Sequence, residues 1–472
     1  MSFHSKSSLA RRFQLVLASF QQRDGLPFAD VLSESQIERA FAEEGGRFAQ
    51  AEEDVYTPAV TLWGFLSQVL FKQEQRSCLA AVSRIVVLLV ALGRRRPSDN
   101  TGDYCRARAK FPEPVIRRLT LDTSSRLEQQ VPSAWLWHGR HVKLVDGTTS
   151  TAADTPANQN VWPQQPQQAA GLGFPILRIV VLLSLATAMV CGMAMGPYAG
   201  KETSELALFR ELLGQLAAGD ILLADRYYCS YFQIALLREL DVDFVTRLHQ
   251  CRTADFRRGQ ALGKHDHLIM WSRPVRPTWM DPATYDRMPP SLTLREVRVD
   301  VQEAGFRVES LVVVSTLTDA RQYTREELAQ LYRQRWMAEL DIRAIKESLG
   351  LDVLRCKSPE MVRKELWTGL LAYNLIRQTM AQSAAEHGVS PRQLSFTAAM
   401  QQLAATWCLL PLAAEHLARL LIDVHREHLA HHEVGHRPNR IEPRAVKRRP
   451  KPHALLTTPR REARAALLAG QG

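Results

Sequence analysis

The chain has 472 residues, which is too long for one ordinary hydrophobic core, so two or three domains are expected. Hydrophobic residues make up 46% and charged residues 23%, proportions that are typical of a globular protein and argue against a disordered chain. The net charge of +11 and the pI of about 9.5 favour a polyanionic partner, most simply nucleic acid, although membrane surfaces also attract cations.

The cysteines and the N-terminus bear on the compartment. Seven scattered cysteines, an odd number without any CxxC pair, argue against a zinc–cysteine site and indicate free thiols in a reducing compartment such as the cytoplasm. The basic N-terminus lacks a long apolar segment and a small-residue cleavage site, so we interpret it as mature protein rather than a signal peptide.

Residues 1–135 are expected to form a helical N-terminal region. Thr57 followed by Pro58 has the pattern of a helix start, with a capping hydroxyl and a proline at the first helical position. Apolar segments at 60–71 and 78–93 predict core helices. A basic cluster follows, and it is either a solvated surface or a DNA-binding face. Its members are Arg94, Arg95, Arg96, Arg106, Arg108, Lys110, Arg117 and Arg118.

From residue 136 onward, short apolar segments alternate with helical ones, which predicts an α/β domain over 136–249. The expected elements are a strand within 141–149 that ends at Asp146, strands at 173–189 and 190–198, a helix at 201–220, a strand within 221–228 that ends at Asp225, a helix at 231–240 and a strand at 242–248.

Residues 179–197, IVVLLSLATAMVCGMAMGP, are uncharged and nearly long enough to span a membrane. Two buried strands joined by a tight turn are the alternative. The opening IVVLL suits a buried strand, and polar residues and a proline dilute and end the segment. We therefore expect buried strands.

The rest of the chain changes character twice. Residues 250–320 alternate like strands and predict a β-rich insertion. Helices return over 321–390, which we interpret as the second part of the core, and the last of them is expected to end at Gly388. Residues 391–472 are expected to be a helical C-terminal region, whose basic tail at 437–464 is disordered and suited to phosphate contact.

Two acidic residues stand where apolar strands are expected to end. Asp146 follows the apolar residues of the first strand, and Asp225 follows ILLA at 221–224. Open α/β sheets build their sites at the carboxyl ends of strands. A single aspartate there is commonly a turn or cap residue, so the interpretation depends on finding a third acid.

The third acid is expected on a helix at 331–350, LYRQRWMAELDIRAIKESLG. At 100° per residue, four polar side chains fall within about 40° of Glu339, namely Tyr332, Arg335, Arg343 and Lys346. An adjoining apolar stripe consists of Leu331, Ile342, Ile345 and Leu349. Asp341 falls near 200°, on the opposite side of the helix, and Glu347 is a weaker candidate than Glu339.

Three carboxylates of this kind could hold two Mg²⁺ ions, which prefer hard oxygen ligands. Two metal ions about 4 Å apart activate the attacking oxygen and stabilise the leaving oxygen of a phosphodiester. The Tyr332 hydroxyl and the flanking cations would then hold substrate phosphates, and Arg335 could bind one bidentately. The alternative is a solvated amphipathic helix face.

These residues resemble a known family. Tyr332, Arg335, Glu339 and Lys346 fit the spacing Y-x2-R-x3-E-x6-K, which is the signature of DDE transposases of the insertion sequence four family. LVDGTT at 144–149 and ILLADRYYCSYF at 221–232 resemble the first and second Asp motifs of that family. Two further stretches, at 97–112 and 155–175, resemble segments of one of its subgroups. The resemblance runs from roughly residue 55 to residue 385.

The resemblance implies an RNase H-like mixed-sheet core, interrupted by the β-rich insertion, in which Asp146, Asp225 and Glu339 are the catalytic and metal-binding acids. It implies Mg²⁺, with Mn²⁺ as a substitute, and cleavage and joining of double-stranded DNA at transposon ends and targets. Tyr332, Arg335 and Lys346 would bind DNA phosphates, and Arg226, beside the second Asp, is a further candidate. The helical N-terminal region would recognise the transposon ends. The C-terminal region would support a homodimer in the synaptic complex, and the protein would be associated with the nucleoid. Arg343 lies outside the signature.

Two alternatives remain. A transposase-derived repressor would bind DNA without chemistry. HEVGH at 432–436 also matches the HExxH pattern of zinc metallopeptidases. That chemistry needs both histidines on one helix face, but Gly435 and Pro438 predict that the helix stops at about residue 433.

Overall fold

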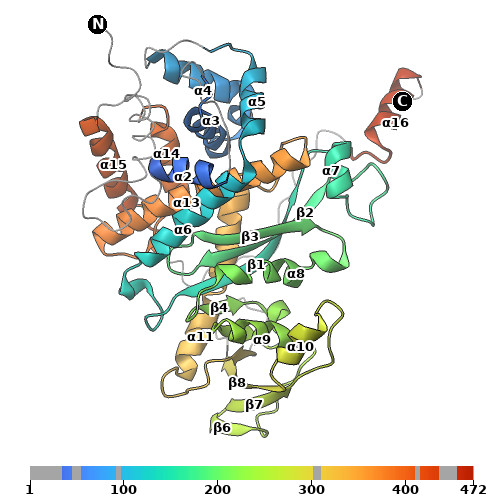
Figure 1. Cartoon of the computed structure of the whole chain (residues 1–472), viewed down its shortest axis with the longest axis vertical. Helices are drawn as coiled ribbons and strands as arrows, with labels where there is room; N and C mark the ends of the chain where they lie inside the picture. Colours follow the sequence, from blue (N-terminus) through green and yellow to red (C-terminus); the bar gives the residue numbers. More distant parts are fainter. Residues whose placement is uncertain are drawn as a thin grey trace. The chain divides into compact units, whose positions relative to one another are not determined.

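The computed structural model describes residues 34–44, 55–91, 97–300, 310–409, 415–434 and 454–470. The chain divides into two compact units, shown in Figure 1 with colours that follow the sequence. Unit 1 consists of Met1–Val142, Val181–Met193 and Met337–Gly435, and unit 2 consists of Lys143–Val180, Ala194–Trp336 and His436–Gly472.

Unit 1 is mainly helical and is built round α13, a 29-residue helix over Pro359–His387. This helix packs against α3, α6, α14 and α15 (Figure 1). The other helices of the unit are α2 (Glu34–Glu43), α3 (Pro58–Leu70), η1 (Gln73–Arg76), α4 (Cys78–Ala91), α5 (Thr101–Lys110), α6 (Glu113–Gln129), η2 (Ser133–Trp135), α12 (Trp336–Arg343, in this unit from Met337), η6 (Ala344–Ser348), η7 (Pro391–Gln393), α14 (Phe396–Thr406) and α15 (Glu415–Ala430).

Two helix ends in unit 1 follow directly from their residues. The Thr57 side chain accepts a hydrogen bond from the Val60 N–H, and Pro58 occupies the first helical position of α3. At the other end of the unit, α13 stops at Gly388, whose left-handed φ of 68° suits a residue without a Cβ atom. Both boundaries agree with the sequence prediction.

The buried side chain of Asn374 ties α13 to two other segments of unit 1. Its Oδ1 accepts from the Val190 N–H at 2.8 Å, and its Nδ2 donates to the carbonyls of Val190 at 3.0 Å and Thr120 at 3.1 Å. The residue is fully buried. One amide therefore satisfies three buried backbone groups.

Replacing Asn374 with leucine, which has a similar volume, should lower the free energy of unfolding by about 3 kcal/mol, because it leaves those backbone groups without a hydrogen-bond partner. Denaturant unfolding followed by circular dichroism measures this change. Gln401→Leu, at an exposed position of α14, is the control and should change stability by less than about 0.5 kcal/mol. An equal unfolding midpoint for the two variants would contradict the assigned role.

The strands form one nine-stranded mixed sheet in the order β3-β2-β1-β4-β5-β9-β8-β7-β6. β4 and β5 are parallel, whereas the pairs from β5 through β9, β8 and β7 to β6 are antiparallel. The strand bounds are β1 Val142–Thr151, β2 Ile176–Ser184, β3 Val190–Pro197, β4 Ile221–Ala224, β5 Asp243–Arg247, β6 Gln260–Gly263, β7 Asp266–Ser272, β8 Ser291–Asp300 and β9 Ser310–Ser315. The predicted α/β class with a mixed sheet is confirmed.

The uncharged segment at 179–197 forms strands, as predicted. β2 and β3 take up most of it and are buried along nearly their whole length. A tight turn joins them, with Ala188 in the left-handed region at φ 63°. Among the helices that the structure describes, none has the length and apolar character needed to cross a membrane.

Short helices surround the strands of unit 2. α9 packs against β5, and α11 packs against β5 and β9. The bounds are α7 Pro156–Val161, η3 Lys201–Thr203, α8 Glu205–Arg210, η4 Leu213–Gln215, η5 Arg226–Tyr228, α9 Tyr231–Glu239, α10 Pro282–Arg287, α11 Arg325–Arg333 and α16 Arg460–Leu468.

Two element predictions in unit 2 are wrong. The helix expected over 201–220 shrinks to the six residues of α8, because Gly214 weakens helix formation and the Asp220 carboxylate accepts from the Ala217 N–H to stabilise a turn. Disorder was expected throughout the basic tail, but α16 begins at Arg460. Residues 437–453 of the tail lie outside the described residues.

Candidate active site

Unit 2 brings together two of the three predicted acids. Asp225 follows β4 directly, and its Oδ1 accepts from the Tyr227 N–H at 2.7 Å, which starts the short helix η5. Asp146 lies on β1, the neighbour of β4 in the sheet, and its Oδ1 accepts from the Gly147 N–H at 2.8 Å. Both side chains are therefore held by nearby backbone N–H groups.

The prediction that the first strand ends at Asp146 is wrong. β1 continues for five more residues to Thr151, and Asp146 lies at its middle. The change at Asp146 is one of burial, because the four residues before it are buried, whereas Asp146 and the three residues that follow are half-buried. The apolar residues before Asp146 therefore correspond to the buried half of β1 and do not show where the strand ends.

Two residues of the family signature also belong to unit 2. Arg335 Nη1 lies 3.7 Å from Asp146 Oδ2, and both side chains are about four-fifths buried, at 20% and 19% exposure. Burial raises the pKa of Tyr332 to about 12, although the neighbouring Arg335 and Arg247 oppose this rise. The Tyr332 hydroxyl is therefore a neutral hydrogen-bond donor at physiological pH. Arg226 lies in η5 and is exposed.

The helix predicted over 331–350 is not continuous. α11 ends at Arg333, two turn residues follow, α12 covers Trp336–Arg343, and a π-helical segment, η6, covers Ala344–Ser348. A uniform 100° per residue therefore does not apply from Tyr332 to Lys346, and the prediction that five side chains share one face of a single helix is wrong.

Glu339 and Lys346 belong to unit 1, since the boundary between the units falls after Trp336. Glu339 lies in the first turn of α12, and Lys346 lies in η6. That Glu339 and Lys346 form one site with Asp146 and Asp225 stays a prediction. Arg343 pairs with Glu347 at 3.5 Å, and both side chains are about two-thirds exposed, at 67% and 69%.

Asp341 has a structural environment that differs from those of the predicted catalytic acids. Its side chain is 1% exposed and forms ion pairs with Arg377 at 2.8 Å and Arg392 at 2.9 Å. These two cations satisfy the carboxylate within unit 1. The sequence-based choice of Glu339 over Asp341 as the third acid agrees with this arrangement.

The donor set of the site suits a hard divalent cation, because carboxylate oxygens are the ligands that Mg²⁺ prefers. In the described ranges, no three His, Cys, Asp or Glu side chains are already gathered round one point. Mg²⁺ commonly uses only one or two carboxylates and completes its shell with water and substrate phosphate. Asp146 and Asp225 fit that mode of binding.

Sequence reasoning missed two neighbours of these acids, Glu205 and Tyr228. Burial raises the pKa of Glu205 and, to a greater degree, that of Tyr228, and the charge of Asp225 raises both. Glu205 begins α8, after the Ser204 cap, and only its position at a helix start could be read from the sequence. Its proximity to Asp225 depends on tertiary packing.

The basic cluster of the N-terminal region is largely engaged within unit 1. Arg106 pairs with Asp103, and Arg118 pairs with Glu43 at 2.7 Å. Arg117 lies over the ring of Trp367. Residues 94–96 lie outside the described residues. Internal pairing lowers the number of charges that this cluster can offer to DNA.

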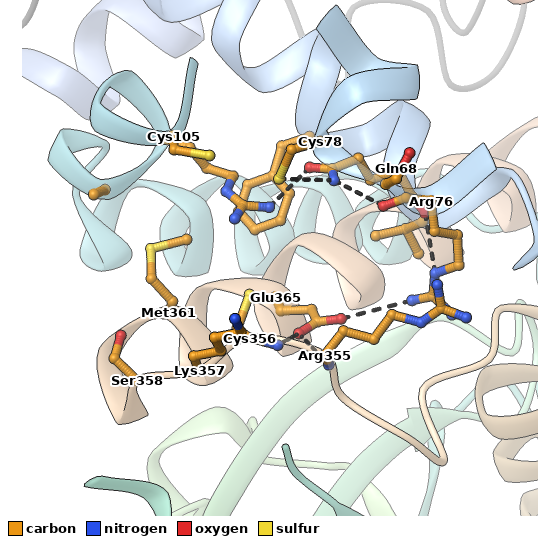
Figure 2. Close-up of a pocket in the computed structure, with 15 residues that line it drawn as sticks. Gln68, Arg76, Cys78, Cys105, Arg355, Cys356, Lys357, Ser358, Met361 and Glu365 are labelled. Carbon is orange, nitrogen blue, oxygen red and sulfur yellow. Dashed lines mark hydrogen bonds and ion pairs between the residues drawn. The ribbon is translucent and has the colours of Figure 1, made fainter. Parts of the chain in front are cut away.

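Unit 1 also contains a cavity of about 530 Å³, shown in Figure 2. Glu365 accepts from the backbone N–H groups of Arg355 and Cys356, each at 2.9 Å, and lies 3.7 Å from Arg76. Gln68 donates to the Arg76 carbonyl at 2.9 Å. These contacts hold the walls of the cavity together, and none of the predicted catalytic acids lines it.

All seven cysteines of the chain are free thiols.

The HEVGH segment does not form the helix that a zinc peptidase needs. α15 ends at Ala430, and His432 lies beyond it, 3.1 Å from His428. Gly435 and His436 lie outside the described residues. The predicted helix end before the second half of the motif is therefore confirmed.

Comparisons with known proteins identify the family of the chain. A family model described as a transposase DDE domain matches residues 137–375, more than half of the chain. The transposase InsG of insertion sequence element IS4 from Escherichia coli is 27% identical over 345 residues, which cover 71% of this chain and 73% of that protein. The transposase of IS421 from Escherichia coli is 38% identical over 82 residues, 17% of this chain and 21% of that protein.

Among solved structures, a piggyBac transposase synaptic complex with hairpin DNA matches with a TM-score of 0.42 and 10% identity, over 88% of this chain and 85% of that one. The family model spans the β1 and β4 acids and the signature residues of α11, α12 and η6. The recognition made from the motifs is confirmed, and the chain belongs to the DDE transposases, enzymes of DNA transposition.

Proposed function

We propose that this transposase binds the inverted repeats at the ends of its element, cleaves phosphodiester bonds there and joins the 3′ ends to target DNA. The observation that carries the proposal is the placing of Asp146 and Asp225 on adjacent strands of unit 2, beside Arg335 and Tyr332. Carboxylates held by backbone N–H groups, next to a cation, suit a site for metal ions and phosphate.

Asp146, Asp225 and Glu339 would hold the divalent cations, for which we propose Mg²⁺ with Mn²⁺ as a substitute. When bound, two such ions supply activation of the attacking oxygen and neutralisation of the leaving oxygen. The ion pair between Arg335 and Asp146 holds the guanidinium beside the carboxylate, where it would bind a phosphate next to the cation.

Tyr332, Arg335, Lys346 and Arg226 are proposed to bind DNA phosphates. The neutral hydroxyl of Tyr332 can donate a hydrogen bond to a phosphate oxygen throughout the physiological pH range. The exposed Arg226 adds a charge next to Asp225. Contacts of this kind position the DNA and carry no sequence information, which base contacts must supply elsewhere.

The division of labour along the chain is part of the proposal. Residues 136–249 and 321–390 would form the RNase H-like core, and β6–β9 within 250–320 support a β-rich insertion. Residues 1–135 would recognise the ends, and residues 391–472 would support a homodimer in the synaptic complex with double-stranded DNA.

The test uses the full-length protein and DNA that flanks its own reading frame. With Mg²⁺ or Mn²⁺, wild-type protein should nick the element end, and chelation by EDTA should lower the rate to background, because the acids bind the cation rather than the DNA. Denaturing gels measure the nick. Metal-independent binding with no cleavage under either ion would instead indicate a transposase-derived repressor.

A further inference from the structure

The carboxylate of Glu205 packs directly against Gly147, the residue after Asp146. A Cβ atom built on Gly147 would lie 2.3 Å from Glu205 Cδ and 2.6 and 2.7 Å from its two oxygens. The Gly147 N–H meanwhile donates to Asp146 Oδ1. The two carboxylates therefore flank the same glycine, and only the missing side chain makes room for Glu205.

The hydroxyl of Tyr228 lies near Glu205, Asp146 and Asp225. Tyr228 is fully buried, and its Oη has no hydrogen-bond partner among the described residues. Burial raises the pKa of this hydroxyl, and the nearby groups that add to the rise are Glu205, Asp146, Asp225 and Tyr227. A buried hydroxyl that lacks a partner is destabilising, so a ligand or its bound water is expected there.

Ordinary structural roles do not explain the position of Glu205. As the first residue of α8 it gains the helix-dipole interaction whether or not it is buried. Arg178 lowers the pKa of Glu205, but burial and Asp225 outweigh it and leave that pKa raised. The Arg178 guanidinium donates to the Thr203 carbonyl at 2.7 Å and lies over the Tyr198 ring. Arg178 therefore offsets only part of the unfavourable effect of burial and of Asp225 on the charged Glu205 carboxylate.

We propose that Glu205 is a fourth carboxylate of the divalent-cation site, outside the three-acid signature, and that the Tyr228 hydroxyl hydrogen-bonds a water of the bound ion. This rests on the proposed function of Asp146 and Asp225. The carboxylates do not form a cluster in which all of them could contact one ion directly. Water molecules bound to the cation would therefore link it to some of them, because Mg²⁺ keeps several waters when bound.

The experiment measures Mn²⁺ binding to full-length protein without DNA, by electron paramagnetic resonance of the free ion. Glu205→Gln should weaken Mn²⁺ binding at least about tenfold, the usual loss when a supporting group of a metal site is removed. Glu202→Gln removes the same charge from an exposed residue three positions earlier and should leave the affinity within about twofold.

Gly147→Ala displaces the same carboxylate without changing any charge. The methyl group would push the flexible end of Glu205 away, so this variant should weaken Mn²⁺ binding to a similar extent, and the double variant should lose little more. Thermal unfolding checks that each variant is folded.

Mn²⁺ affinity that is unchanged in Glu205→Gln, or losses that add fully in the double variant, would overturn the proposal. Absence of Mn²⁺ binding by the wild-type protein would do the same. Failure of the wild-type protein to cleave DNA is a separate result and bears on the proposed function, because the binding assay contains no DNA.

Discussion

Asp225→Asn should reduce DNA strand cleavage by about three orders of magnitude or more, while the protein stays folded. Loss of one ligand charge from a metal-assisted displacement removes several kcal/mol of transition-state stabilisation, and about 4 kcal/mol corresponds to a thousandfold in rate. Asparagine keeps the shape and the Oδ1 atom that accepts from the Tyr227 N–H at 2.7 Å. The turn that starts η5 therefore persists, and only the charge is lost.

The measurement is single-turnover nicking of element-end DNA at saturating Mg²⁺, which separates chemistry from binding. Asp286→Asn, at an exposed position of α10, is the matched control and should cleave at the wild-type rate. Cleavage by Asp225→Asn at a rate comparable to that of Asp286→Asn would remove Asp225 from the site and with it the proposed metal chemistry.

The sequence predicted the elements of this fold wherever a local signal determined them. Thr57 and Pro58 start α3, and Gly388 ends α13, because a cap and a left-handed residue act within a few positions of the boundary. The strands at 179–197 were predictable from an apolar run that is diluted by polar residues. Burial there reaches both faces, as expected for strands of a sheet that is covered on both sides.

Elements whose geometry depends on tertiary contacts could not be predicted in this way. The turn at Gln334 and Arg335 and the π-helical segment after Arg343 interrupt a sequence whose periodicity fits one helix. Glu205 shows the same limit at the site, because its contact with Gly147 joins residues 58 positions apart. No spacing rule connects such residues before the fold is known.

The placement of Glu339 and Asp341 on opposite sides of a helix was predictable despite the break, because the two lie on one short helix, α12. Residues two apart on a helix point about 200° from each other, so they cannot serve the same surface. Asp341 is the buried member, held by Arg377 and Arg392. Glu339 is half-buried and belongs to the signature.

Asp341 anchors α12 within unit 1 through a network of buried polar groups. Its Oδ1 accepts from Arg377 at 2.8 Å and its Oδ2 from Arg392 at 2.9 Å. Arg392 also donates to the carbonyls of Ser184, at 2.9 Å, and Leu185, at the turn after β2. One carboxylate thus links α12, α13, η7 and the β2–β3 turn.

Asp341→Ala should lower the free energy of unfolding by about 3–5 kcal/mol, because it leaves two buried guanidinium groups without their anion. Glu347→Ala removes an acid from an exposed ion pair with Arg343 in the same segment, and should cost less than about 1 kcal/mol. Urea unfolding followed by circular dichroism measures the unfolding midpoints of both variants. Glu339→Gln should have the wild-type midpoint but lose DNA cleavage. Equal midpoints for Asp341→Ala and Glu347→Ala would show that the buried network does not hold α12, and the structural distinction between the two acids of α12 would fail with it.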